Sequence, residues 1–339
     1  MASIKQQKNH YHLPVLNRDE LREKEKDVSF DDLLGENKNH HEDELLETLG
    51  INPKTTIEFN DTRPVIPTVT KEYVSYSELA TWMECSFRHK LKYIDGLTSF
   101  DGPSEHTEFG QVIHDAMESF LKEKKMPDAE NVRAQLVEHF SQLDKAKVSK
   151  LKEKDWHDVI KPMLLEVPGF LDKTFPNWEF VASEFELMEP IDNQQRKFKG
   201  FIDGIIRVPK EQKIKRFVSK KSDGYEYWII DWKSTSWGWR MDKKKDSKKI
   251  MQLALYKHFW GTKLGVNPKD IRCAFILLKR TPKKGEPMCE LVAEPVGEVT
   301  VEKALEAIHK MLASIKKGWF TKNREACKYC AYRDTEHCT

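Results

Sequence analysis

The spacing of hydrophobic residues predicts helices in the first part of the folded chain. Between residues 77 and 175, apolar positions recur every three to four residues, which is typical of amphipathic helices. The clearest cases are SELATWMECSFRHKLKYIDGL and GQVIHDAMESFLKEKK, with Ser77 as a candidate N-cap of the first. Asp128 is a candidate N-cap of a third helix. A fourth stretch, WHDVIKPMLLEVPGFLDKTF, contains Pro162 and Pro168, and we expect the prolines to interrupt it.

Between residues 178 and 296 the pattern changes to that of β-strands. Strands are predicted in WEFVASEFELMEP, RKFKGFIDGIIRVP, EYWIIDWKS, IRCAFILLKR and CELVAEPV, with a helix in KIMQLALYKHFWGTKLG. The second and third runs flank the turn signal Ser222-Asp223-Gly224, so we expect an antiparallel pair. A final helix, VEKALEAIHKMLASIKKG, would end at Gly318. This order predicts a mixed α/β fold, with a mixed central sheet flanked by helices and a helical insertion before it.

The first 70 residues have a different character. They are polar, carry 9 Lys and Arg against 14 Asp and Glu, and end in the breaker-rich NDTRPVIPTVT. We predict a largely disordered acidic segment over residues 1–70 and one domain over residues 71–339. Within residues 28–50, leucines embedded among acids suggest a short helix that binds a protein partner or the folded domain, and the alternative is a solvated tail with a transient helix.

The overall composition excludes several classes of protein. The 339 residues are 39% hydrophobic and 33% charged, and no apolar run approaches the roughly 20 residues that span a bilayer. The first residues lack the apolar core of a secretory leader, so a secreted disulfide scaffold is not expected. We expect an intracellular, cytoplasmic protein without a membrane span.

Positive charge is concentrated in residues 209–249, which hold 13 basic and 6 acidic side chains although the whole chain has a net charge of only +2. Such a stretch favours binding of a polyanion, and a lysine-rich solvated hairpin is the alternative. Tryptophans lie in the same stretch. We expect Trp232 to pack on the sheet, and Trp237 and Trp239 to face solvent or DNA. The basic residues predicted to contact nucleic acid are Arg240, Lys243, Lys244 and Lys245.

Acidic residues end three of the predicted strands. Asp231 and Lys233 project from the same face of YWIIDWK, Asp203 ends an apolar run in FIDGII, and Glu184 has a similar place in VASEFEL. Because acids at one sheet edge repel one another unless a cation neutralises them, these oxygens suit Mg²⁺ or Mn²⁺. Lys233 beside such an ion could orient or deprotonate a water for attack on phosphorus. The alternative is a surface ion pair.

Four motifs in this order resemble the RecB-type PD-(D/E)XK nucleases. They are Gly110-x3-His114-x3-Glu118, Gly200-x2-Asp203, Asp231-x-Lys233 and Gln252-x3-Tyr256, the last typical of the RecB type. The spacing of Gln252 and Tyr256 puts both on one helix face. His114 and Tyr256 could instead be ordinary core residues.

The resemblance implies a restriction-endonuclease-like core and assigns roles to these positions. It implies that His114, Asp203 and Asp231 bind the metal, that Lys233 serves the attacking water, and that Glu184 is a supporting acid. Gln252 and Tyr256 would complete the catalytic set. The nuclease domain would comprise a helical part at 77–175, a sheet core at 178–296 and a C-terminal helix with cysteines at 300–339.

The six cysteines divide into two groups. Cys273 is expected to be a buried hydrophobe, and Cys289 has no assigned role. The tail contains Cys327-x2-Cys330-x7-Cys338, and Cys85 is the candidate for a fourth ligand. The setting of Cys85 resembles that in AddB-like and CRISPR-associated members of the family, which implies a [4Fe–4S] cluster that joins the two ends of the domain. Tetrahedral zinc is the alternative, and free thiols are a third possibility.

These observations lead to one functional prediction and one rival. We predict a Mg²⁺- or Mn²⁺-dependent deoxyribonuclease in DNA repair, recombination or replication. Action on single-stranded DNA from an end is what the family resemblance implies. The rival is a non-catalytic or partner-dependent nucleic-acid-binding subunit of a DNA-processing complex. Intact acids and an intact lysine favour the enzyme.

Overall fold

The computed structural model describes residues 71–97, 104–143, 153–210, 224–244 and 246–338. The predicted N-terminal segment with its partner-binding helix, Lys245, and the Ser222-Asp223 part of the predicted turn lie outside the described residues. Among the described helices, none is both long and apolar enough to cross a membrane.

Six strands of the described chain form one mixed sheet. They are β1 (Tyr73–Ser75), β2 (Glu179–Pro190), β3 (Lys197–Pro209), β4 (Tyr225–Thr235), β5 (Ile271–Lys279) and β6 (Cys289–Glu294). The order is β1-β3-β4-β5-β6, with β2 antiparallel to β3 along the opposite edge of β3. β3 and β4 pair antiparallel, as predicted, whereas β1 with β3 and β4 with β5 are parallel.

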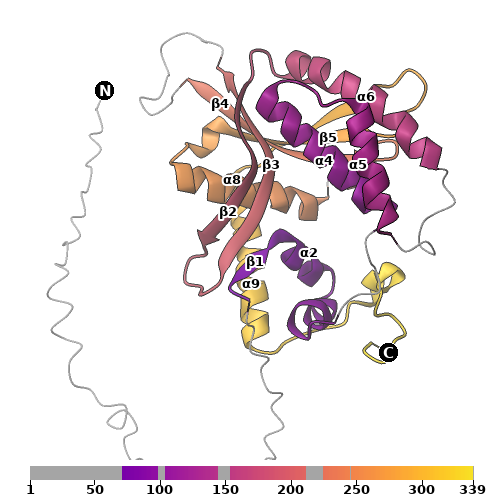
Figure 1. Ribbon diagram of the computed structural model, residues 1–339. Coiled ribbons are helices and arrows are strands. Elements are labelled where there is room, and N and C mark those ends of the chain that lie inside the picture. The colour runs from indigo at the N-terminus through magenta and orange to yellow at the C-terminus, as the bar shows by residue number, and fades with distance from the viewer. Residues whose placement is uncertain (1–70, 98–103, 144–152, 211–223, 245, 339) are drawn as a thin grey trace, which may run out of the picture. The chain divides into compact units, whose positions relative to one another are not determined.

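Helices cover both faces of this sheet, which confirms the predicted fold class (Figure 1). One face packs against α4 (Glu105–Glu123), α5 (Ala129–Ser141) and α6 (Glu153–Thr174). The other packs against α2 (Tyr76–Glu84), α8 (Ser247–Leu264) and α9 (Glu298–Lys316). On β4, Ile229 belongs to the second core and its neighbour Ile230 to the first, so the sheet separates two hydrophobic layers. The remaining elements are α3 (Ser86–His89), η2 (Lys90–Ile94), α7 (Met241–Lys244), η3 (Pro268–Asp270) and η4 (Arg324–Tyr329).

The edge of β3 that faces β4 is shared between two partners. β1 pairs with β3 from Lys197 to Lys199, and β4 pairs with it from Gly204 to Pro209. Residues 200–203 therefore have no strand partner on this edge within the described chain. We call this place, where the unpaired residues 200–203 of β3 lie next to the part of β4 beyond Ile230, the β3–β4 fork.

Two local predictions differ from the structure. The α6 helix continues through Pro162 and Pro168. Its fully buried residues Ile160, Met163 and Val167 pack in the α4–α6 core, and this packing outweighs the backbone hydrogen bonds that the prolines remove. The first helix is capped by Ser75, whose hydroxyl accepts from the Glu78 N–H, and not by Ser77. Asp128 is at the N-cap of α5 as predicted, without a side-chain capping bond.

The two ends of the described chain contact each other. The Phe87 N–H donates to the Thr321 carbonyl at 3.1 Å, and the Asn323 side-chain amide donates to the Glu84 carbonyl at 2.8 Å. Trp82 Nε1 also donates to Ser314 Oγ of α9. The segment around Cys85 is therefore held against the C-terminal tail.

Candidate metal centre

The fork between β3 and β4 assembles the predicted site from three separate elements. Asp203 lies on the unpaired stretch of β3, Asp231 and Lys233 lie on β4 just beyond the last β3–β4 pair, and His114 comes from α4. A Cβ on Gly110 would lie 3.5 Å from Ser234 Oγ, which shows how closely the first half of α4 approaches β4.

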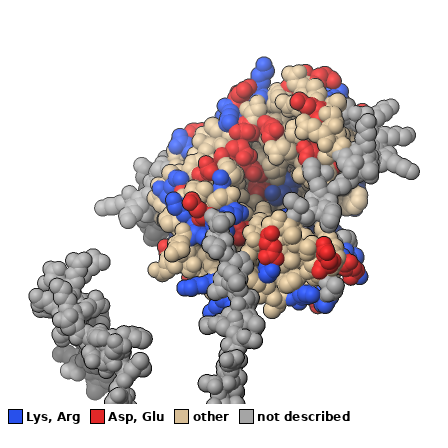
Figure 2. All heavy atoms as spheres, turned by 60° about the horizontal axis from the view of Figure 1, so that its bottom comes forward, with Lys and Arg blue, Asp and Glu red and all other residues tan. Residues whose placement is uncertain are grey.

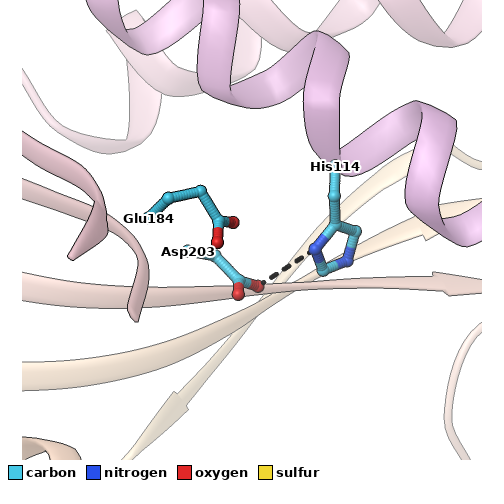
Figure 3. A group of neighbouring side chains, drawn as sticks. All are labelled: His114, Glu184 and Asp203. Atoms are coloured by element: carbon cyan, nitrogen blue, oxygen red, sulfur yellow. Dashed lines mark ion pairs between the residues drawn. The ribbon is translucent and has the colours of Figure 1, made fainter. Parts of the chain in front are cut away.

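His114, Glu184 and Asp203 meet as one group. Each offers a ligand atom, and these atoms all lie within 4.8 Å of one another (Figure 3). His114 Nδ1 is 3.5 Å from Asp203 Oδ2, and the same oxygen accepts the Trp232 backbone N–H at 2.8 Å. Nitrogen and carboxylate ligands from three elements at this spacing suit a divalent ion.

Glu184 reaches this group through an unusual backbone conformation. Its φ is +45°, in the left-handed region that non-glycine residues rarely adopt. It lies between the Ser183–Gly204 and Phe185–Ile202 pairs, hence opposite Asp203. Residues held in this region often occur at functional sites. The family resemblance implies only a supporting role for Glu184, whereas the structure places it inside the group.

Asp231 lies outside this group and pairs with Lys233. The carboxylate is 1% exposed and the ammonium 34% exposed, and the two are in direct contact. Apart from this pairing, neither Asp231 oxygen accepts a hydrogen bond from the described residues. A buried carboxylate with so few partners fits a nearby cation. A metal-binding role for Asp231 itself stays a prediction.

The protonation tendencies of the site also fit a cation. Burial, and then the negative charge of Asp231, raise the pKa of Asp203 well above its usual value. Burial and the nearby Glu118 raise the pKa of Glu184. Burial and the charge of Lys233 lower the pKa of His114, which favours the neutral imidazole that binds metals. The acids repel each other, and a bound cation would relieve this repulsion.

The state of Lys233 follows from its two acidic neighbours. Burial lowers the pKa of Lys233, but the charges of Asp231 and Asp203 outweigh it, so the pKa is raised. The side chain is therefore an ammonium at neutral pH. An ammonium can orient a water by donating a hydrogen bond, whereas a lysine that deprotonates water must first be neutral. The role of donor therefore fits this state better.

Gln252 and Tyr256 lie on α8, and burial and then the charge of nearby Asp231 raise the pKa of Tyr256. Gln252 Nε2 donates to the Tyr256 hydroxyl at 3.1 Å, as their spacing predicted. The Tyr256 ring packs on Gly200, where a Cβ would lie only 2.7 Å from Tyr256 Cε1. Tyr256 is buried, so it belongs to the core as well as to the surroundings of the acids.

The tryptophan predictions are partly wrong. Trp232 is buried as expected, and Trp237 is 68% exposed. Trp239 is only 8% exposed and packs on Phe275 with ring centroids 5.0 Å apart, so it does not face solvent or DNA. Its hydrophobic area is covered by the sheet, which a position in a basic stretch does not reveal.

The basic residues near Trp237 differ in their surroundings. Arg240 and Lys243 are exposed, and Lys244 pairs with Glu290. Lys245 lies outside the described residues. Figure 2 shows a hollow in the molecular surface with Asp and Glu side chains gathered along it and Lys and Arg side chains close by. Acidic and basic side chains, the types that suit metal ions and phosphates respectively, thus lie on one face.

The four predicted cluster ligands line one small pocket. Cys85, Cys327, Cys330 and Cys338 all border it, and none of the six cysteines forms a disulfide. Cys85 Sγ accepts the backbone N–H groups of Arg88 and Asn323, each at 3.4 Å. Within the described residues, no three of the sulfurs lie within 4.8 Å of one another. Cys273 and Cys289 are buried elsewhere, and burial raises the pKa of each to about 12.

One contributor to the site carried no sequence signal. The Trp232 N–H fixes an Asp203 oxygen, yet a backbone donor leaves no trace in residue types. Only the splitting of β3 from β4 exposes this N–H to a side chain.

Comparison with known proteins supports this geometry at the level of the family. A search among curated proteins found no match to the chain. The sequence profile of the PD-(D/E)XK nuclease superfamily, whose members are metal-dependent nucleases, matches residues 73–335. These residues include every part of the centre described above, and the chain belongs to the PD-(D/E)XK nuclease superfamily.

Proposed function

We propose that this protein is a RecB-type deoxyribonuclease that hydrolyses phosphodiester bonds of single-stranded DNA from an end, using Mg²⁺ or Mn²⁺. The observation that carries the proposal is the convergence of His114, Glu184 and Asp203 at the β3–β4 fork, beside the Asp231–Lys233 pair. Hydrolysis of DNA needs a cation near the phosphate and a positioned water, and these residues suit both needs.

In this proposal the residues of the fork have two roles, metal binding and hydrogen-bond donation. Mg²⁺ or Mn²⁺ held by His114, Glu184 and Asp203 would polarise the phosphate oxygens and favour attack by water. Lys233, held by Asp231, donates a hydrogen bond to the water or to a phosphate oxygen. Because it stays charged, it also stabilises the negative charge that grows on the phosphate.

The surroundings of the fork support a single-stranded substrate. Trp237 is largely exposed four residues after Lys233, with the exposed Arg240 and Lys243 following it. An exposed indole offers a stacking surface for an unpaired base, and cations bind the backbone. Paired bases hide their faces, so a duplex gains less from this arrangement.

The pocket formed by the cysteines favours a [4Fe–4S] cluster over zinc. Four thiolates around one zinc ion at about 2.3 Å would bring the sulfurs to roughly 3.8 Å of each other. Among the described residues no three of these sulfurs come within 4.8 Å of one another, and this supports the larger cluster. The N–H groups directed at Cys85 Sγ are the type of contact that tunes such clusters. We propose that the cluster stabilises the contact between the chain ends.

An anaerobic digestion tests the catalytic proposal. End-labelled single-stranded and duplex DNA would be incubated with Mg²⁺ or Mn²⁺ and with wild type, Lys233→Ala or Lys263→Ala. Lys263 is a matched control because it is a similarly exposed lysine paired with an acid, Glu189, away from the fork. We expect cleavage by wild type and Lys263→Ala and at least a 100-fold loss in Lys233→Ala. Full activity of Lys233→Ala would show that the site is wrong.

The same assay addresses the rival function. Binding of DNA without hydrolysis by the wild type would favour a non-catalytic or partner-dependent subunit. The described residues contain the whole fork, so deletion of residues 1–65 should leave hydrolysis intact and affect only recruitment by a partner. Loss of hydrolysis in the truncated protein would contradict this assignment.

A further inference from the structure

An open groove lies where β3 changes partners. β1 leaves β3 after Lys199 and β4 joins it at Gly204, and a groove with a volume of about 320 Å³ occupies this region. Its walls come from β1, the start of α2, β3 and the Gln252–Tyr256 face of α8. The groove adjoins the metal centre without being part of it.

One side of the groove is an alternating series of cations and aromatic rings. Lys71 Nζ lies 4.4 Å from the centre of the Tyr73 ring, and Lys199 Nζ lies 5.2 Å from the same ring. Lys199 Nζ is also 5.3 Å from the Phe201 ring. Because residues two apart on a strand share a face, the series leads along β3 towards Asp203.

The ring at the end of this series is available to a ligand. Phe201 is 43% exposed, which is unusual for a large apolar residue in the middle of a strand. A phenylalanine presented beside lysines is the combination that single-strand-binding proteins use for bases and phosphates.

The cations of the groove retain binding capacity despite their acidic neighbours. Lys71 contacts the buried Glu78, but Glu78 already accepts two hydrogen bonds from Arg196, so this cluster carries excess positive charge. Lys199 pairs with Glu186 at 3.1 Å, and that carboxylate is 52% exposed. Exposed pairs of this kind are weak, so a phosphate can replace Glu186 as the partner of Lys199.

The groove is physically joined to the catalytic fork. Gly200, between Lys199 and Phe201, supports the Tyr256 ring at a distance that excludes any side chain there. Gln252 and Tyr256 line the groove, and Tyr256 is also close enough to Asp231 and Asp203 to feel their charges. A strand in the groove would therefore run directly to Asp203.

We propose that this groove is the subsite for the part of a single DNA strand next to the scissile phosphate. A base stacks on Phe201, and Lys199 and Lys71 bind backbone phosphates. The placement of this subsite next to the scissile phosphate rests on the proposed nuclease function. Binding of the single strand itself can be measured without hydrolysis.

Binding of a fluorescein-labelled 20-nucleotide single strand to the full chain in EDTA tests the stacking contact. We expect Phe201→Ala to lower affinity about 10-fold without changing affinity for a duplex of the same sequence. Trp319→Ala is the control, since Trp319 is an exposed aromatic residue on the C-terminal segment outside the groove. Circular dichroism would verify that each variant is folded. Equal losses for single strand and duplex, or no loss, would overturn the stacking assignment.

Charge substitutions test the phosphate contact separately. Lys199→Ala should weaken binding and reduce the slope of log affinity against log salt by about 0.7, the value for one phosphate on a single strand. Glu186→Gln should increase affinity about threefold, because it removes the competing partner of Lys199. The matched control is Glu179→Gln at the other end of β2, 43% exposed and paired with Arg207. An unchanged salt slope in Lys199→Ala, or equal effects of the two glutamine variants, would overturn the assignment of Lys199 to a backbone phosphate.

The two proposals fail in different ways. Phe201-dependent binding of the single strand without any metal-dependent cleavage would leave the subsite standing and refute the nuclease. Cleavage that depends on Lys233, combined with wild-type affinity in Phe201→Ala and Lys199→Ala, would refute the subsite alone.

Discussion

Glu78 and Asp203 are both largely buried carboxylates. The strongest charge effect on Glu78 comes from the positive Arg196, and that on Asp203 comes from the negative Asp231. Burial raises the pKa of Glu78, but the hydrogen bond with His89 and the charge of Arg196 outweigh it and lower the pKa below 4.5. Around Asp203, burial and the negative charge of Asp231 act in the same direction and raise the pKa well above 3.8. Glu78 is thus paired with cations of the fold, whereas the charge of Lys233 offsets only part of what burial and Asp231 do to Asp203.

Replacing Glu78 should destabilise the protein. Glu78→Gln leaves the buried Arg196 without its carboxylate, and we expect a loss of about 3–5 kcal/mol in unfolding free energy at pH 7. A carboxyl with a lowered folded pKa stabilises above its unfolded pKa, and this is lost as the pH falls through the folded value. The loss measured by urea denaturation should therefore shrink below pH 4.5. A loss that persists unchanged in acid would contradict the ion-pair explanation.

Replacing Asp203 should have the opposite effect in the absence of divalent ions. Asp203→Asn removes a repelled charge, and its amide oxygen can still accept the Trp232 N–H. We expect a gain of about 1 kcal/mol, or roughly 2–4 °C in Tm, at pH 8. Because the destabilisation builds up as the pH rises from the unfolded pKa to the raised folded pKa, the gain should be smaller at pH 5. Lower thermal stability than wild type at pH 8 would show that Asp203 is a structural acid.

Individual site residues could be predicted where chemistry depends on short spacing. Asp231 and Lys233 at i, i+2 and Gln252 and Tyr256 at i, i+4 are brought together by the strand and helix that contain them. The approach of Glu184 to His114 and Asp203 could not be predicted, because it depends on a left-handed φ in β2. The burial of Trp239 depends on Phe275 of a distant strand, so residue type alone misled the prediction.

At the scale of elements, Gly200 and Gly169 should respond to alanine in opposite ways. Gly200→Ala places a methyl 2.7 Å from the Tyr256 ring and 3.2 Å from Phe198, which forces α8 and β3 apart. We expect a loss of about 1–3 kcal/mol. Gly169 is exposed on α6 with nothing within 4 Å of a new Cβ, so Gly169→Ala should gain about 0.5–1 kcal/mol. Thermal unfolding of the two variants shows whether Gly200→Ala lowers and Gly169→Ala raises the stability. Unchanged stability of Gly200→Ala would contradict the close packing.

The types of most elements follow from periodicity, but their pairing does not. Hydrophobic spacing predicts α4, α8, α9 and the strands from β2 to β6. It gives no sign of β1, which is three residues long and pairs with β3 more than 120 residues later. The fork exists because β1 and β4 share one edge of β3, and such a long-range pairing has no local pattern. The continuity of α6 through two prolines likewise depends on packing with α4 and α5.

At the scale of the whole molecule, the cysteine pocket should control both iron content and stability. Cys85 and Cys338 lie more than 250 residues apart in sequence but border one pocket. If a cluster joins them, Cys338→Ser should lose iron and lower Tm by about 5 °C or more. Cys289→Ala is the control for iron content, because Cys289 is buried and does not border this pocket. A colourless anaerobic protein with stoichiometric zinc would contradict the cluster.

Binding of Mn²⁺ to the purified full chain tests the central claim most directly. Titration followed by electron paramagnetic resonance should show one site per chain in wild type, lost in Asp203→Asn and in Glu184→Gln. Glu118→Gln is the control, because this acid lies near Glu184 but pairs with Lys122 outside the group. Retention of the Mn²⁺ site in Glu118→Gln and its loss in the other two variants is the predicted result. Wild-type Mn²⁺ binding by Glu184→Gln and Asp203→Asn would show that the fork is not the metal centre.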